Sequence, residues 1–194
     1  MNLPNKLTIS RIGLTILFMF FLFAHGPLYK VLALFTFLIA AFTDFLDGYI
    51  AKRYALTTDF GKFIDPIADK FLTLAAFLAF VEMGLVPAWM VMVIILRELI
   101  ITSMRLIALR KEYVIAATFA GKHKTVSQMT AIVMILVFII LREFGRLLQF
   151  WTPQFQGNFE TAILAFMYLT VALTLISGAF FLVKNMDIFR NDGR

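Results

Sequence analysis

The sequence predicts an all-α integral membrane protein with six transmembrane helices. Apolar residues make up 61% of the 194 residues, against roughly 45 to 50% in soluble domains. The mean hydropathy is +0.89, and the apolar residues gather in long runs. Because a membrane-spanning helix needs about 20 residues, six such runs use up the chain. We therefore expect residues 1–194 to form a single membrane domain.

Turn residues and charges divide the first half of the chain into three spans. The first predicted span, 9–24, ends before Gly26-Pro27, a strong turn signal. The second, 31–50, runs into a charged stretch, and the third, 62–83, follows it. Pro66 fits the first turn of a helix that begins near Asp59 or Gly61, where its missing N–H costs least.

The second half of the chain predicts three more spans, at 87–108, 125–148 and 159–183. Gly84 and Pro87 separate the third span from the fourth, and the stretch from Pro153 to Gly157 separates the fifth from the sixth. All the connections are short, so no separate soluble domain is expected.

Lysine and arginine gather on one side of the predicted spans. This side holds Lys6, Arg11, Lys52, Arg53, Lys62, Arg110, Lys111, Lys122, Lys124, Lys184, Arg190 and Arg194. The other side holds Lys30, Arg142 and Arg146. The positive-inside rule therefore predicts that both termini are cytoplasmic. The net charge of +6 largely reflects this asymmetry, and no nucleic-acid partner is expected from it.

Four aspartates occupy the same predicted depth. Asp44 and Asp47 lie near the cytoplasmic end of the second span, and Asp65 and Asp69 lie near the start of the third. At about 1.5 Å per residue, all four fall within roughly 10 Å of one membrane edge. Asp44 and Asp47 share a helical stripe with Gly48, and Asp65 and Asp69 are one turn apart. We expect the two pairs to face each other at the cytoplasmic side, which places the predicted active site there.

Four like charges beside hydrocarbon need a strong positive partner. Clustered carboxylates suit magnesium, manganese or calcium, whereas zinc more often recruits His or Cys, and the chain has no cysteine. Open coordination positions on such ions can hold a pyrophosphate. The alternative is interfacial salt bridges, which stabilise little. In that case the aspartates would pair with Lys52, Arg53, Lys62 and Lys70.

The aspartates belong to a longer pattern. It reads Asp44-x-x-Asp47-Gly48-x-x-Ala51-Lys52, eight residues, then Gly61-x-x-x-Asp65-x-x-x-Asp69. This pattern resembles the signature of the CDP-alcohol phosphotransferases, membrane enzymes with six transmembrane helices. Lys52 stands where the family usually has arginine, and it offers a point charge in place of a forked donor. Three flanking stretches, NLPNKLTISR, RELIITSMR and GKHKT, look like the bacterial phosphatidylglycerophosphate synthase branch.

The resemblance implies a reaction and a set of site residues. Glycerol 3-phosphate would attack the β-phosphorus of CDP-diacylglycerol, releasing CMP and leaving phosphatidylglycerophosphate. The resemblance assigns two divalent metals, Mg²⁺ or Mn²⁺, to Asp44, Asp47, Asp65 and Asp69, with Asp69 also the candidate base. It places the nucleotide against Gly48 and Gly61, with Lys52 facing its phosphates. It further implies a homodimer and a multi-pass protein of a bacterial cell membrane.

The acceptor is a phosphate dianion, so its pocket should contain cations. Arg97 and Arg105 share a helical face, and an arginine inside an apolar run normally indicates a water-filled cavity. Lys122 and Lys124 follow at the start of the fifth span. The predicted acceptor site is therefore Arg97, Arg105, Lys122 and Lys124. The alternative is that these cations only reflect the positive-inside rule. In that case Glu98 would form a structural ion pair with Arg97 or with Arg105.

Two other functions remain open at this point. The same motif serves transfer to other acceptors, such as those of phosphatidylserine, phosphatidylinositol phosphate and cardiolipin synthases. These acceptors differ in charge, so a panel of acceptors separates them. Intramembrane aspartates could also belong to a cation transporter, although a transport route favours polar residues near mid-depth.

Overall fold

The computed structural model describes residues 3–54, 59–110, 119–149 and 151–190, and these form six α-helices without a strand. Side chains are described for 10–43, 70–108, 121, 123–149 and 151–185. The helices are α1 (Leu3–Phe23), α2 (Pro27–Tyr54), α3 (Asp59–Glu82), α4 (Ala88–Arg110), α5 (Phe119–Leu147) and α6 (Pro153–Arg190). The predicted all-α class is confirmed for this part of the chain, and each predicted apolar run lies on one helix to within one residue at its ends.

The helices extend beyond the apolar runs that predicted them. α5 begins at Phe119, six residues before the predicted start, and α6 continues to Arg190. A helix can continue past its apolar segment because its backbone hydrogen bonds do not depend on side-chain hydropathy. As a result Lys122 and Lys124 lie on α5 and not in a connecting loop. α3 begins at Asp59, one of the two predicted starts.

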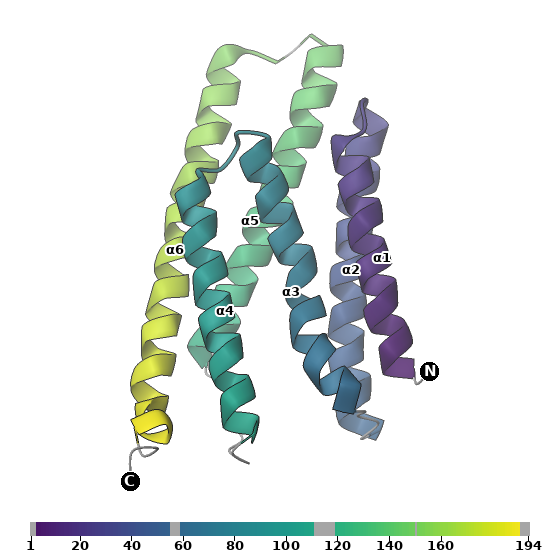
Figure 1. The fold of residues 1–194 in the computed structure, drawn as a ribbon. Helices are drawn as coiled ribbons and strands as arrows, with labels where there is room; N and C mark the ends of the chain where they lie inside the picture. Colours follow the sequence, from purple (N-terminus) through teal and green to yellow (C-terminus); the bar gives the residue numbers. More distant parts are fainter. Residues whose placement is uncertain (1–2, 55–58, 111–118, 150, 191–194) are drawn as a thin grey trace.

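Successive helices run in alternating directions (Figure 1). The first residue of α1 and the last of α6 therefore lie at the same end of the bundle, which we call the terminal end. The ends of α2 and α4 and the starts of α3 and α5 lie there too. α1 packs on α2 and α3, α4 packs on α3 and α6, and α5 packs on α2, α3 and α6. The end of α2 and the start of α3, which carry the aspartate motif, therefore lie at the same end of the bundle.

The core is apolar and draws on all six helices. Phe18 of α1 and Phe37 of α2 are buried, with ring centroids 5.7 Å apart. Small residues such as Ala40, Ala76 and Ala131 are fully buried at helix contacts. In lipid, association depends on close van der Waals packing, and small residues allow helices to approach. The core thus suits helices that meet inside a membrane.

Local hydrogen bonds close the turns opposite the terminal end. Gly84, with φ +70°, follows α3. The Gly84 N–H donates to the carbonyl of Val81 and the Leu85 N–H to that of Phe80, both at 2.9 Å, a Schellman arrangement. Before α6, the Phe155 N–H donates to the Thr152 hydroxyl at 3.2 Å, which caps the helix.

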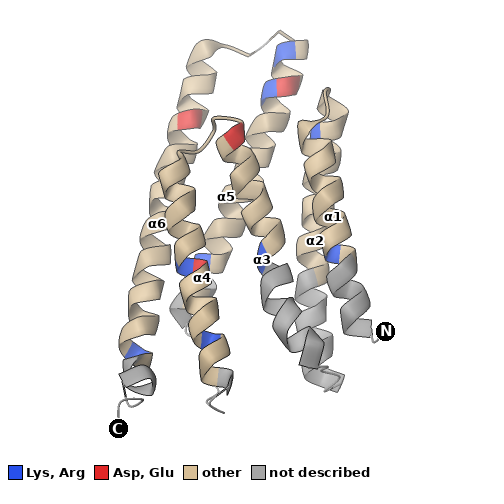
Figure 2. Ribbon diagram, in the orientation of Figure 1, with Lys and Arg blue, Asp and Glu red and all other residues tan. Residues whose placement is uncertain are grey.

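The outer surface of the bundle is strongly apolar. Ile16, Phe42, Met92 and Phe180 are each more than 60% exposed. A monomer in water rarely leaves so many large apolar side chains uncovered, whereas lipid tails cover them well. Two stretches, His123–Leu147 and Pro153–Asn185, are long and apolar enough to cross a membrane. Figure 2 shows described charges towards both ends and a further charged cluster near the middle of α4, with apolar helix surface making up most of the rest.

Candidate functional site

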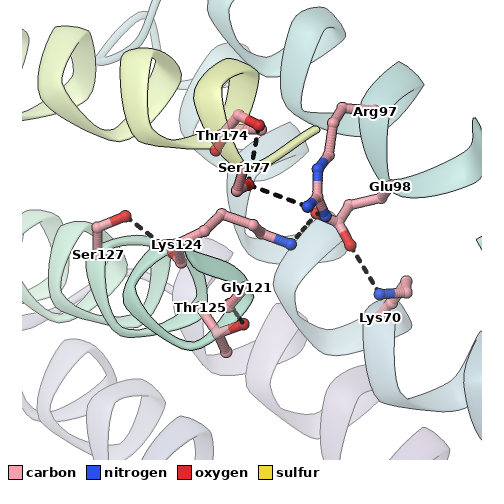
Figure 3. A network of polar contacts seen from close by, with 9 residues as sticks. All are labelled: Lys70, Arg97, Glu98, Gly121, Lys124, Thr125, Ser127, Thr174 and Ser177. Atoms are coloured by element: carbon pink, nitrogen blue, oxygen red, sulfur yellow. Dashed lines mark hydrogen bonds and ion pairs between the residues drawn. The ribbon is translucent and has the colours of Figure 1, made fainter. Parts of the chain in front are cut away.

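A buried carboxylate, that of Glu98 on α4, lies at the centre of a polar network (Figure 3). Its Oε2 accepts a hydrogen bond from Lys70 Nζ of α3 at 2.7 Å. Its Oε1 accepts from Arg97 Nη1 at 3.2 Å and also from Lys124 Nζ of α5. A buried charge is costly unless it is paired and hydrogen-bonded, and Glu98 meets both conditions. One side chain therefore ties α3, α4 and α5 together.

Arg97 connects the same network to α6. Its Nη2 donates to the Ser177 hydroxyl at 3.0 Å, and Ser177 in turn donates to the Thr174 carbonyl at 3.0 Å. The side chain lies close to the α6 backbone at Gly178, where an added Cβ would come within 3.2 Å of Arg97 Cγ. The absence of a side chain at Gly178 thus makes room for the arginine.

Lys124 enters the bundle from the second turn of α5 and is 5% exposed. Its backbone carbonyl accepts a hydrogen bond from Ser127 at 2.8 Å, while its ammonium bonds to Glu98. A lysine placed on a helix only to satisfy the positive-inside rule would extend towards water or lipid headgroups. Lys124 instead points at the carboxylate between α3 and α4.

The network has more positive than negative charge. Lys70, Arg97 and Lys124 carry three positive charges against the single negative charge of Glu98, which leaves two positive charges among these side chains. The Arg97 Nε is buried and has no hydrogen-bond partner among the described residues. A cationic group with unused donors is suited to an anion that carries several acceptor oxygens.

The sequence predicts that Arg97 and Arg105 lie on one face of α4, and the contacts of Arg105 test this. Its guanidinium lies over the ring of Phe181 at 5.6 Å, and Phe181 is one turn beyond Ser177 on α6. Ile101, between the two arginines, is 5% exposed. The predicted common face is therefore confirmed, and it is directed towards α6. Glu98 has Arg97 as a partner, as expected of a structural companion, and bonds to Lys70 and Lys124 as well.

The predicted metal and nucleotide residues lie outside the residues whose side chains the structure describes. These are Asp44, Asp47, Gly48, Lys52, Gly61, Asp65 and Asp69, together with Lys122 of the acceptor set. Their helices are described: the first four belong to the last part of α2, the next three to the start of α3, and Lys122 to α5. Lys70 directly follows Asp69, so the Glu98 network begins at the end of the aspartate motif.

The donor chemistry of the motif suits a divalent cation. Four carboxylates provide hard oxygen ligands of the kind that Mg²⁺ and Mn²⁺ prefer. Among the described side chains, no group of three or more His, Asp or Glu residues could hold a metal. Among the residues whose side chains are described, the acidic residue nearest in sequence to the motif is Glu82, at the far end of α3. The four motif aspartates remain the candidate ligands.

Residues 1–184 match the family model of the CDP-alcohol phosphatidyltransferases. The chain belongs to this family. The match spans nearly the whole chain, so the family assignment includes both the aspartate motif and the Glu98 network.

Several bacterial members of the CDP-alcohol phosphatidyltransferase family resemble the chain. It is 36% identical to the CDP-diacylglycerol--glycerol-3-phosphate 3-phosphatidyltransferase of Bacillus subtilis (strain 168), with 97% of each protein covered. A probable phosphatidylglycerophosphate synthase of Mycobacterium tuberculosis is 40% identical over 68% of the chain and 64% of that protein. The transferase of Rickettsia bellii is 39% identical over 68% of the chain and 72% of its own length.

Sequence reasoning missed some members of the network. Ser177 and Gly178 lie in an apolar run of α6, and the sequence does not indicate which residue they contact. The sequence suggests Lys70 only as a partner of the aspartates, yet its ammonium bonds to Glu98. An available signal was a short polar stripe, Thr170, Thr174 and Ser177, on a helix that is otherwise apolar. All three side chains are buried.

Proposed function

We propose that this protein transfers a phosphatidyl group from CDP-diacylglycerol to sn-glycerol 3-phosphate, giving phosphatidylglycerophosphate and CMP for phospholipid biosynthesis. The observation that carries the proposal is the similarity to the Bacillus subtilis transferase across 97% of both chains. The Glu98 network supports it, because two surplus positive charges beside the aspartate motif suit the phosphate dianion of the acceptor.

The proposed chemistry starts at the aspartate motif. Asp44, Asp47, Asp65 and Asp69 would hold two Mg²⁺ or Mn²⁺ ions. Such ions, when bound, neutralise the pyrophosphate and the charge that develops on the leaving group. The Asp69 carboxylate takes the proton of the acceptor hydroxyl as its oxygen bonds to the β-phosphorus. The bond from that phosphorus to the CMP oxygen then breaks, and CMP leaves with the electron pair.

The remaining residues orient the two substrates. Gly48 and Gly61 allow the cytidine nucleotide to lie against the α2 and α3 backbones, and Lys52 faces its phosphates. Arg97, Arg105, Lys122 and Lys124 bind the acceptor phosphate. Arg97 and Lys124 suit this role because they share one carboxylate oxygen and retain further donors.

A panel of acceptors tests the reaction. Purified protein in detergent with CDP-diacylglycerol and Mg²⁺ should release CMP fastest with glycerol 3-phosphate. Serine, inositol phosphate and phosphatidylglycerol form the comparison set. Faster release with any of these would replace the proposed acceptor. Cation flux into liposomes without CMP release would favour the transporter alternative.

Substitution of a motif aspartate tests the metal assignment. Asp65→Asn should lower kcat by about 100-fold or more, because loss of a ligand weakens metal binding. Asp59→Asn, at the first residue of α3 and outside the motif, is the matched control and should keep its activity. Full activity of the Asp65 variant at saturating Mg²⁺ would contradict the assignment.

We further propose six membrane spans, cytoplasmic termini, an active site at the cytoplasmic side of a bacterial cell membrane, and a homodimer. The chain has no cysteine, so single cysteines introduced before α1 and after α4 can be labelled without background. Both should react only from the cytoplasmic side. Cross-linking in native membranes tests the dimer, and a purely monomeric product would contradict it.

A further inference from the structure

Glu98 is placed differently from an ordinary counter-ion. It accepts hydrogen bonds from three cations on three helices, and it is 5% exposed. Arg97 and Lys124 bond to the same oxygen, Oε1, so the carboxylate holds their charged nitrogens next to each other. Without that oxygen the two cations would repel each other in a poorly solvated site.

The cations retain donors for a ligand. Arg97 uses one N–H on Glu98 and one on Ser177, and its buried Nε is unpartnered among the described residues. An arginine has more N–H donors than these bonds use, and so has a lysine ammonium bonded to one carboxylate. Ser177 fixes the other end of the guanidinium from α6. The orientation of Arg97 is thus set by Glu98 on one side and by Ser177 on the other.

An ion pair that only stabilised the bundle would need fewer cations. A single lysine or arginine would neutralise Glu98, and further cations add repulsion at a buried site. The excess of positive charge around Glu98 is better explained if a second anion binds there and neutralises it. A doubly charged phosphate monoester matches the two positive charges left over in this network.

We propose that Glu98 and Ser177 are positioning residues for the acceptor phosphate. They hold Arg97 and Lys124 side by side, with free N–H donors, and do not themselves bind the acceptor. This inference rests on the proposed function, because it takes glycerol 3-phosphate as the molecule that these cations bind. It predicts that loss of Glu98 impairs acceptor binding even though loss of its negative charge makes the network more cationic.

Steady-state kinetics with the full-length protein test the proposal. In Glu98→Gln the KM for glycerol 3-phosphate should rise about 10-fold or more, while kcat and the KM for CDP-diacylglycerol stay within about threefold. Glu98→Asp keeps the charge but is shorter, so its KM should rise by a smaller factor. Ser177→Ala, which frees only one end of Arg97, should raise KM by about threefold. Glu160→Gln, an exposed glutamate on α6, is the matched control and should leave KM unchanged.

The possible results separate positioning from other roles. A lower KM in Glu98→Gln would mean that the carboxylate only offsets the positive charge of the neighbouring cations. An unchanged KM with reduced thermal stability would mean that Glu98 has a structural role. Either result overturns the proposal. If Glu98→Gln does not fold, wild-type KM values in both Glu98→Asp and Ser177→Ala overturn it. Failure of the wild-type protein to use glycerol 3-phosphate would instead overturn the proposed function.

Discussion

Two lysines are buried among the described residues, and their partners differ. Lys30, in the first turn of α2, is 8% exposed, and its Nζ donates to the carbonyls of Leu22 and Ala24 at 2.6 and 2.7 Å. Lys124, in the second turn of α5, is 5% exposed and bonds to Glu98, which also accepts from Lys70 and Arg97.

The two partner sets give the lysines different roles. Lys30 places a positive charge on carbonyls at and just beyond the C-terminal end of α1, where the helix dipole is negative, so it satisfies groups that would otherwise lack a partner. Lys124 joins a group that already has enough positive charge for its single carboxylate. A buried lysine is therefore evidence of a binding site only when its surroundings have more positive charge than their acids neutralise.

Of the two buried lysines, Lys124 has the larger predicted effect on activity. Lys124→Met should lower kcat/KM for glycerol 3-phosphate by about 100-fold, since a charge-assisted bond to a buried phosphate is lost. The fold should persist, because Glu98 keeps Lys70 and Arg97 as donors. Kinetics with varied glycerol 3-phosphate and a thermal melt in detergent measure both. Wild-type kinetics in a folded variant would remove Lys124 from the acceptor site.

Lys30→Met is the corresponding substitution of the other buried lysine, and it tests a structural role. It leaves the carbonyls of Leu22 and Ala24 without their lysine donor, at a cost of about 1 to 3 kcal/mol. The melting temperature should fall, and kcat/KM of the folded fraction should equal that of the wild type. A selective loss of acceptor binding in this variant would show that Lys30 also affects the acceptor site, so that the two lysines do not differ in role.

Thr152→Ala tests a second structural contact opposite the terminal end. It removes the cap on α6 that Thr152 provides to the Phe155 N–H and should cost about 1 kcal/mol. Thr161→Ala is the control, because the Thr161 hydroxyl donates to the Gly157 carbonyl within the same helix at 2.8 Å. Equal melting temperatures for the two variants would show that the cap contributes little.

Gly178→Ala should have the smallest effect, confined to the network. The new Cβ would lie 3.2 Å from Arg97 Cγ, so the arginine must shift by a few tenths of an ångström. We expect the KM for glycerol 3-phosphate to rise about two- to threefold. Gly157→Ala on the same helix is the control. Its new Cβ would have no atom within 4 Å, and it brings the same gain in helix propensity as Gly178→Ala. A KM change common to both variants would exclude a specific effect on Arg97.

Sequence alone predicted much of this protein, because the predicted features depend on local patterns. The six helices follow from the apolar runs and the turn residues between them, and the turn at Gly84 from the conformational freedom of glycine. The resemblance of the aspartate motif to a known signature implied the family, and the match over residues 1–184 confirms it. The common face of Arg97 and Arg105 followed from helical periodicity.

The tertiary structure decided which polar residues meet. Lys70, Glu98, Lys124 and Ser177 are far apart in the sequence, and no local pattern relates them, yet they join four helices in one network. Their association depends on how the helices pack, which is set by the shapes of buried apolar faces. Hydropathy and periodicity determine that a segment is a helix and which face it buries, but only the packed bundle determines the partner of a buried charge.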